Sequence, residues 1–394
     1  MPGAAPRSLL VEGWRFLPHS YAIANEFQLL EFAKVPGLRL FHRDVPYLHP
    51  HWTPTPGLHR AEAQQILLGL QEPPEDQTPE ALLRMTFPYD FSRSGIARTC
   101  VFGTAEHRCV PEDYLSGTAS LSRAMQETDF TIVTCSRWSR QGFIQDGAPP
   151  ERVALVPLGA DPAVLRPLPP EERAALRAQL KLDGFVFLNV GAMTRNKGLP
   201  VLFKAFAELL RRRPEARLVI KGVDDVFASL SLLPQWSGAL AAGDWERIQA
   251  RLACYGQSFS HADMAKLYQA ADAFVTPYHA EGFSLTTLEA MACGLPVVCT
   301  EGGPTDDFTR PEFALRIRSE LRAHQRVERG WELLPDWEHL LEHLTWLMDN
   351  PGFAARARVA APAFVAGNYT WRHTAQRLLE LLFPGPATSR SPRS

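Results

Sequence analysis

Two glutamates, Glu281 and Glu289, stand on either side of a short segment that contains glycine and serine. An apolar run at 273–276 predicts a buried strand before them, and leucine and alanine at helical spacing predict a helix that Ser284 would cap. A glycine and a proline end this helix, and a second apolar run predicts another strand at 297–300. The pattern therefore predicts a strand, loop, helix and strand joined by a right-handed crossover in a parallel sheet.

The loop that opens into this helix has the chemistry of an anion site. Backbone N–H groups at Phe283–Thr286 have no acceptor within the helix, and the helix dipole is positive at this end. Helical side chains lean toward the N-terminus, so Glu289 leans toward the ligand that Glu281 would contact from the loop. Ionised carboxylates bind hydroxyl groups well, which predicts a phosphate with hydroxyls on both sides, as in a nucleotide sugar. Alternatively, Glu281 only caps the helix and Glu289 is a solvated helix residue.

The run from Glu281 to Val298, E-G-F-S-L-T-T-L-E-A-M-A-C-G-L-P-V-V, resembles the signature of glycosyltransferase family 4. This family (glycosyl transferases group 1) consists of retaining enzymes with the GT-B fold, and its two glutamates have seven residues between them, as here. The resemblance implies that Glu281 faces the donor sugar and that Glu289 binds the ribose. It also implies that backbone amides hold the diphosphate, at Gly282, Phe283, Ser284, Leu285 and Thr286.

A second basic loop follows the strand predicted at 185–190. Lys197 lies between that strand and an amphipathic helix, where a lysine would neutralise a diphosphate. The family resemblance implies a glycine–arginine pair near Gly191 and a lysine–glycine pair downstream; Lys197 matches the second, but Ala192 occupies the arginine position. We expect Arg195 to supply that charge, with an ordinary surface lysine at 197 as the alternative.

The first half of the chain is expected to bind the acceptor. His19 and Ser20 precede a helix predicted from Tyr21 to Lys34. They contact the acceptor or the donor phosphate, or else serve as a loop histidine and an N-cap serine. Glu106 and His107 follow a strand predicted at 99–102, and the carboxyl ends of parallel strands face the cleft in such folds. We therefore assign Glu106 a catalytic role beside Glu281 and Lys197, and His107 an acceptor contact. A further helix is expected at 114–128.

Two other segments are candidates for ligand contacts. His42, His49, His51 and His59 lie in or beside a proline-rich loop, but neither a helix-spaced histidine pair nor a neighbouring carboxylate cluster accompanies them. We expect an irregular loop on the acceptor side and no metal ion there. Tyr255 ends a strand predicted at 252–255, and the backbone near it is expected to meet the nucleotide base.

The bulk composition is that of a globular protein with two domains. The chain has 394 residues, of which 45% are hydrophobic, and a net charge of −2, which offers no electrostatic basis for binding nucleic acid. No apolar run is long enough to span a bilayer. The six cysteines lack metal-ligand spacing, so we expect reduced, mostly buried thiols in a cytoplasmic protein. Peripheral membrane contact and the oligomeric state remain open.

We predict an α/β GT-B fold, with two Rossmann-like doubly wound domains facing an interdomain cleft. Residues 1–165 form the acceptor-side domain, 166–366 the nucleotide-sugar domain, 367–384 a helix that crosses back, and 385–394 a disordered tail. The resemblance implies a hexosyltransferase-like retaining enzyme of glycan biosynthesis. It would need no metal and no cofactor besides its nucleotide diphosphate sugar, and its acceptor would be a glycan, a lipid-linked molecule or a small molecule. The alternatives are an epimerase or phosphorylase of the same fold, or a non-catalytic sugar-nucleotide binding protein.

Overall fold

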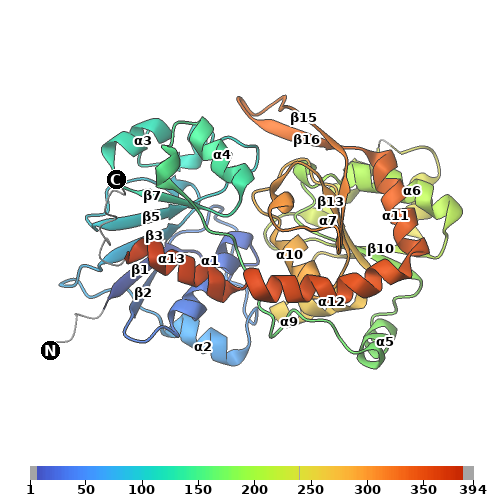
Figure 1. Ribbon diagram of the computed structural model, residues 1–394, viewed down its shortest axis with the longest axis horizontal. Helices are drawn as coiled ribbons and strands as arrows, with labels where there is room; N and C mark the ends of the chain where they lie inside the picture. Colours follow the sequence, from blue (N-terminus) through green and yellow to red (C-terminus); the bar gives the residue numbers. More distant parts are fainter. Residues whose placement is uncertain (1–6, 239, 385–394) are drawn as a thin grey trace, which may run out of the picture.

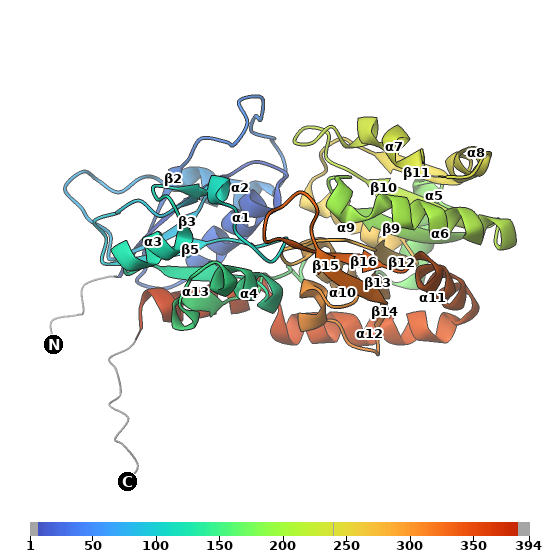
Figure 2. The same ribbon diagram turned by 90° about the horizontal axis from the view of Figure 1, so that it is seen from above.

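The computed structural model describes residues 7–238 and 240–384, and within them two parallel six-stranded sheets lie side by side (Figures 1 and 2). The strands of the first sheet have the order β2-β1-β3-β5-β7-β8. Their bounds are Ser8–Gly13 (β1), Arg39–Asp44 (β2), Ala81–Met85 (β3), Arg98–Phe102 (β5), Thr131–Thr134 (β7) and Val153–Leu155 (β8). All their pairings are parallel, so the carboxyl ends of the strands lie along one edge.

The second sheet has the order β11-β10-β9-β12-β13-β14, which in chain order is the 3-2-1-4-5-6 arrangement of Rossmann domains. Its strands are Phe185–Val190 (β9), Ala216–Lys221 (β10), Leu252–Tyr255 (β11), Ala273–Thr276 (β12), Val297–Thr300 (β13) and Ala314–Ile317 (β14). The bounds of β9, β11, β12 and β13 are those that the sequence predicts. Central strands are apolar on both faces because helices cover both faces of the sheet.

Helices cover both sheets. In the first domain they are α1 (Ser20–Phe32), α2 (Ala61–Gly69), α3 (Leu121–Glu127) and α4 (Arg137–Gln145). In the second they are α5 (Pro170–Gln179), α6 (Leu199–Arg212), α7 (Ser229–Ser237), α8 (Asp244–Gln249), α9 (His261–Ala270), α10 (Leu285–Ala292) and α11 (Trp337–Asp349). The last two helices of the described chain are α12 (Pro351–Asn368) and α13 (Trp371–Leu382). Within the described ranges, no helix combines the length and apolar character that crossing a bilayer requires.

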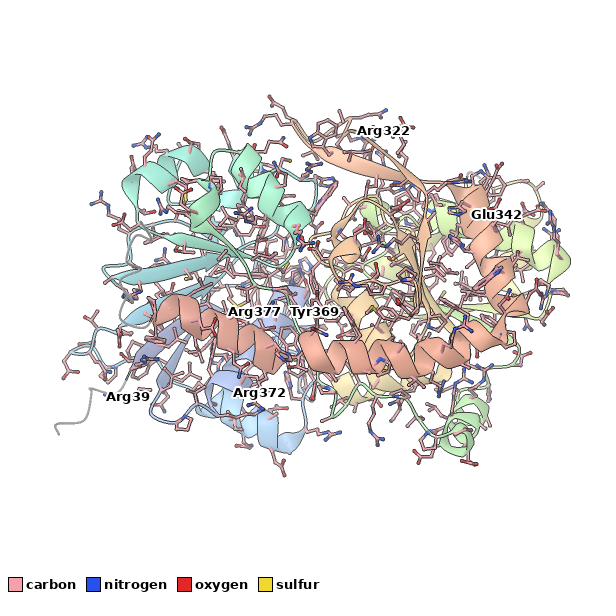
Figure 3. All side chains as sticks on the ribbon, viewed as in Figure 1. Arg39, Arg322, Glu342, Tyr369, Arg372 and Arg377 are labelled. Atoms are coloured by element: carbon pink, nitrogen blue, oxygen red, sulfur yellow. The ribbon has the colours of Figure 1, made fainter. Side chains whose placement is uncertain are left out.

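Two predictions for local structure need correction. The helix expected at 114–128 exists only from Leu121, because Gly117 has a positive φ of 75° and Ser120 caps a new helix by accepting from the N–H of Arg123. The antiparallel hairpin of β15 (Ser319–Ala323) and β16 (Trp331–Pro335) was not predicted. It projects from the second domain above the space between the domains, with Arg322 on β15 labelled in Figure 3.

The chain passes between the domains twice, and the two passages pair with each other. The N–H of Ala160 donates to the carbonyl of Tyr369 at 2.9 Å, and Ala160 forms a parallel bridge with Thr370. Tyr369 lies at the junction of α12 and α13 (Figure 3). Helix α13 then packs along the first domain, where the ring of Trp371 stacks on that of Phe27 of α1 with 5.2 Å between the centroids. The limits 1–165, 166–366 and 367–384 stay predictions, and the tail at 385–394 lies outside the described residues.

Gly159 lets these two passages approach. A Cβ at this position would lie 2.2 Å from the backbone nitrogen of Trp371, so Gly159→Ala must push the passages apart. We expect a loss of about 2 kcal/mol or more in the free energy of unfolding, measured in urea. Gly367→Ala is the matched control, since a Cβ there meets nothing within 4 Å and helix propensity favours alanine. Equal stabilities of the two variants would contradict this role.

Candidate functional site

A cavity of about 700 Å³ opens between the domains. Its lining includes residues that follow the carboxyl ends of β1, β5, β9, β10 and β12, which is where ligands bind in doubly wound folds. The structure therefore brings together segments that are far apart in the sequence. Of the site residues that the sequence predicts, the lining contains His19, Ser20, Glu106, His107, Gly191, Arg195, Lys197, Glu281, Gly282, Phe283, Ser284, Leu285, Thr286 and Glu289.

Tyr255 is the predicted residue that the lining does not include, and its assignment to the base stays a prediction. It ends β11, the edge strand of the sheet, and its ring lies 5.8 Å from that of Phe259. Ser258 and Phe259, in the following loop, line the cavity instead. Their position depends on the path of that loop, which strand periodicity does not predict.

The N-terminus of α10 presents its first amides to the cavity. Ser284 occupies the predicted N-cap position, but it has a left-handed φ of 70° and its side chain caps no backbone N–H. Its Oγ lies 2.7 Å from the hydroxyl of Thr287 instead. Because no side chain in the described chain caps α10, the N–H groups of Leu285 and Thr286 stay available, whereas that of Thr287 donates to the carbonyl of Ser284 at 3.0 Å. With the helix dipole, the two available N–H groups favour an anion at this end of α10.

Lys197 and Glu281 form an ion pair in this cavity, with 2.7 Å between Nζ and Oε1. Gly198 holds the Lys197 loop close to the end of β12: its φ is 70°, and a Cβ there would lie 1.8 Å from the carbonyl oxygen of Pro277. Burial lowers the pKa of Lys197, but the carboxylates of Glu281 and Glu106 outweigh it and raise that pKa above its usual value. The ammonium therefore stays charged at the point where a diphosphate would need a counter-charge.

Glu289 lies on α10 and contacts the second domain's core. The hydroxyl of Tyr268, which is fully buried, donates to Oε2 of Glu289 at 2.7 Å. Burial raises the pKa of Glu289 to about 7, and the hydrogen bond from Tyr268 opposes this increase. Glu289 is thus held at the cavity wall with its carboxyl group near its titration point at neutral pH.

Glu106 and His107 reach the cavity from the first domain and contact the second. The side-chain amide of Asn196 donates to Oε2 of Glu106 at 3.3 Å, which joins Glu106 to the Lys197 loop. The carbonyl of His107 accepts from the N–H of Trp331 on β16 at 2.7 Å, so the unpredicted hairpin holds this segment. Both sequence-predicted residues therefore stand where the domains meet.

His19, rather than Ser20, is the N-cap of α1, and its Nδ1 accepts from the N–H of Tyr21 at 3.2 Å. This corrects the alternative that Ser20 caps the helix; Ser20 is the first helical residue. Burial, and then the charge of Lys197, lower the pKa of His19 to about 4. His19 is therefore neutral at physiological pH and offers the cavity an imidazole without charge.

Sequence reasoning missed several polar residues of the lining, among them Asn196 and Lys221. Asn196 ties the Lys197 loop to the loop after β12, since its carbonyl accepts from the N–H of His279 at 2.7 Å. Lys221 is the last residue of β10, and burial lowers its pKa to about 8. A lysine at the carboxyl end of a predicted parallel strand was the available signal for Lys221.

The architecture is that of known glycosyltransferase structures. A glycosyltransferase from Rickettsia africae ESF-5 superposes with a TM-score of 0.66 at 13% identity, over 97% of this chain and 100% of that chain. Anabaena Alr3699/HepE in complex with UDP-glucose superposes with a TM-score of 0.65 at 16% identity, over 95% of this chain and 99% of that chain. At these identities the similarity is one of fold, and the fold is GT-B, as predicted.

The sequence is similar to curated relatives as well. Residues 172–363 match the family model described as Glycosyl transferases group 1. The D-inositol 3-phosphate glycosyltransferase of Mycobacterium tuberculosis (strain ATCC 25618 / H37Rv) is 30% identical over 264 residues, or 66% of this chain and 50% of that protein. The chain thus spans about half the length of the curated relatives it matches. The second domain is therefore similar to the group 1 glycosyltransferases, which confirms the resemblance.

Glu289 makes the stability of the fold depend on pH. Folding raises its pKa from 4.5 to about 7. The stability that Glu289 contributes is therefore fully present below pH 4.5 and is lost as the pH rises through 7. Between pH 5 and 8, we expect the free energy of unfolding of the wild type to fall by about 1–3 kcal/mol relative to Glu289→Gln. Urea unfolding at several pH values measures this difference. In Glu312→Gln, a change at an exposed site, the free energy of unfolding should vary with pH as it does in the wild type. The same variation in Glu289→Gln would refute the raised pKa of Glu289.

Proposed function

We propose that this protein is a retaining glycosyltransferase, which moves a sugar from a nucleotide diphosphate sugar to an acceptor hydroxyl. The observation that carries the proposal is one cavity lined by Lys197, by the uncapped N-terminus of α10 and by the carboxyl groups of Glu281 and Glu289. These groups match the phosphates and the two hydroxyl-bearing ends of such a donor. The complex of HepE with UDP-glucose, on the same fold, supports this class of donor.

The groups of the cavity suggest how the reaction is assisted. The diphosphate would lie against the amides of residues 282–286 and the ammonium of Lys197, with Glu281 at the sugar and Glu289 at the ribose. When the bond between the anomeric carbon and the diphosphate breaks, negative charge grows on the leaving phosphate, and fixed positive groups stabilise it. Arg195, which also lines the cavity, adds to this charge. Since these groups act where a divalent cation would, we propose that no metal is needed on the diphosphate.

The acceptor is proposed to bind between His19, Ser20, Glu106 and His107, which line the same cavity from the first domain. Glu106 lies close enough to Lys197 and Glu281 to affect the pKa of both. A glycan, a lipid-linked molecule or a small molecule remains the expected acceptor class. The name of the curated relatives makes an inositol phosphate one acceptor to test. A cytoplasmic location and peripheral membrane contact stay proposals.

Lys197→Ala tests the donor site. Removing the ammonium should lower kcat/KM by about 10²–10³-fold, the range found when one fixed stabiliser of a developing anion is lost. The same variant should lose the rise in Tm that UDP, GDP or ADP, whichever binds, causes in the wild type. Lys34→Ala is the matched control, because Lys34 is an exposed lysine just after the end of α1. Unchanged nucleotide binding and turnover in Lys197→Ala would exclude the proposed donor site.

Glu281→Ala separates transfer from its alternatives. We expect the variant to keep its fold, by circular dichroism, and to transfer no sugar, because the group facing the donor sugar is gone. The wild type is assayed with the donor alone and with donor plus acceptor, and NMR identifies the anomer formed. Conversion of the donor without an acceptor would indicate an epimerase. Nucleotide binding without any turnover would indicate a binding protein, and an inverted product would contradict retention.

A further inference from the structure

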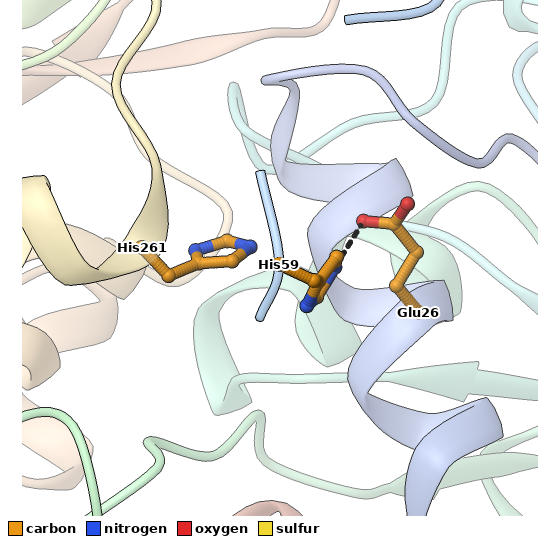
Figure 4. A group of neighbouring side chains, drawn as sticks. All are labelled: Glu26, His59 and His261. Carbon is orange, nitrogen blue, oxygen red and sulfur yellow. Dashed lines mark hydrogen bonds and ion pairs between the residues drawn. The ribbon is translucent and has the colours of Figure 1, made fainter. Parts of the chain in front are cut away.

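One group of side chains among the described residues has the composition of a metal site and plays no part in the donor site. Glu26 on α1, His59 just before α2 and His261 at the start of α9 place potential ligand atoms within 4.8 Å of one another (Figure 4). Glu26 and His59 belong to the first domain, and His261 belongs to the second. The sequence offered no carboxylate near the loop histidines, but the fold brings Glu26 to His59. His42, by contrast, contacts Asn25 at 3.0 Å.

One of the three side chains has a buried polar atom without a partner. Nε2 of His59 lies 3.0 Å from Oε2 of Glu26, and the two side chains are 4% and 0% exposed. Nε2 of His261 is shielded from solvent and has no hydrogen-bond partner. A buried polar atom in that state costs about 1–3 kcal/mol, so natural structures rarely retain one without a function. The histidine rings lie 4.6 Å apart between centroids, and a cation between the three groups would engage all of them.

Backbone contacts hold the group in place. Oε1 of Glu26 accepts from the N–H of Phe16 at 2.5 Å, which orients the carboxylate and leaves Oε2 toward His59. The N–H of His261 donates to the carbonyl of Leu58 at 3.0 Å, so the loop that carries His59 is tied to the helix that carries His261. Hydrogen bonds of this kind orient the ligands of metal sites and tune their affinity.

We propose that Glu26, His59 and His261 bind a zinc ion that links the two domains. Two imidazole nitrogens and one carboxylate oxygen are zinc ligands, whereas magnesium and calcium prefer oxygen alone. Tetrahedral zinc separates its ligand atoms by about 3.3 Å, so the ion draws the three side chains closer than they are now. Three protein ligands leave one position open, and His261 is the member of the group that lines the cavity.

The zinc ion would hold the two domains in the closed arrangement, because moving them apart separates His261 from Glu26 and His59. It is independent of the proposed transfer reaction, since none of its ligands is assigned to the diphosphate. Zinc that binds only the folded, closed chain should raise Tm with increasing concentration, and a chelator should reverse this rise. Both effects are measured without donor or acceptor, so failure of the site and failure of the transferase proposal are distinguishable.

The experiment uses the full chain, freed of metal by a chelator and then titrated with zinc chloride. Calorimetry and elemental analysis should find one zinc per chain in the wild type and in the controls His49→Ala and His51→Ala. His59→Ala and His261→Ala, which remove ligands from opposite domains, should each weaken binding by at least about tenfold, the smallest loss that changes around metal sites cause. Cobalt(II) bound to the wild type should give the visible absorption of a tetrahedral site, a readout that needs no variant to fold.

His343→Ala guards against an adventitious site, because His339 and His343 stand one turn apart on α11 with their rings 4.2 Å apart. Loss of zinc in that variant, with retention in His59→Ala and His261→Ala, would overturn the proposal. So would the absence of stoichiometric zinc or of the cobalt spectrum in the wild type.

Discussion

Lys197 and Glu281 are hydrogen-bonded at 2.7 Å inside the cleft, where each side chain is less than one-fifth exposed. An isolated charge in such a place costs several kcal/mol, so the two loops that carry them have to stay in register. Gly198 packs against Pro277, and Asn196 bonds to the loop at His279, and both contacts keep the loops together. These contacts keep the carboxyl ends of β9 and β12 together, and the charged ammonium of Lys197 lies there for an anionic ligand to bind.

The contacts between the domains determine the shape of the cleft around this pair. Ser136 of the first domain donates from Oγ to the carbonyl of Gly282 at 2.6 Å, directly beside the tip of α10. The hairpin of β15 and β16 reaches the His107 segment, and the paired passages at Ala160 and Thr370 hold the opposite connection. Apolar side chains also meet between the domains, since the ring of Trp52 lies 5.9 Å from that of Phe227 and Trp138 packs with Tyr278 in a buried cluster.

The family resemblance and the structure together explain one departure from the family pattern. Ala192 stands where the pattern has an arginine, and the cavity wall includes both Ala192 and Arg195. The short helical turn Arg195–Lys197 carries both basic side chains on the same loop, so the positive charge is displaced along the loop but is still within the cavity. We therefore propose that Lys197, Arg195 and the α10 amides form the anion site as one unit.

The sequence by itself determined the local elements and the donor-side residues. The bounds of β9, β12 and β13 follow from apolar runs and the turn residues beside them. The motif around Glu281 and Glu289 is a continuous segment whose loop and helix form locally. Tertiary structure alone decided the hairpin of β15 and β16, the turn of the Ser284 side chain away from its capping role, the placement of Tyr255 away from the cavity, and the meeting of Glu26, His59 and His261. Each of these depends on contacts between residues far apart in the chain, and neither residue type nor spacing encodes such contacts in any one segment.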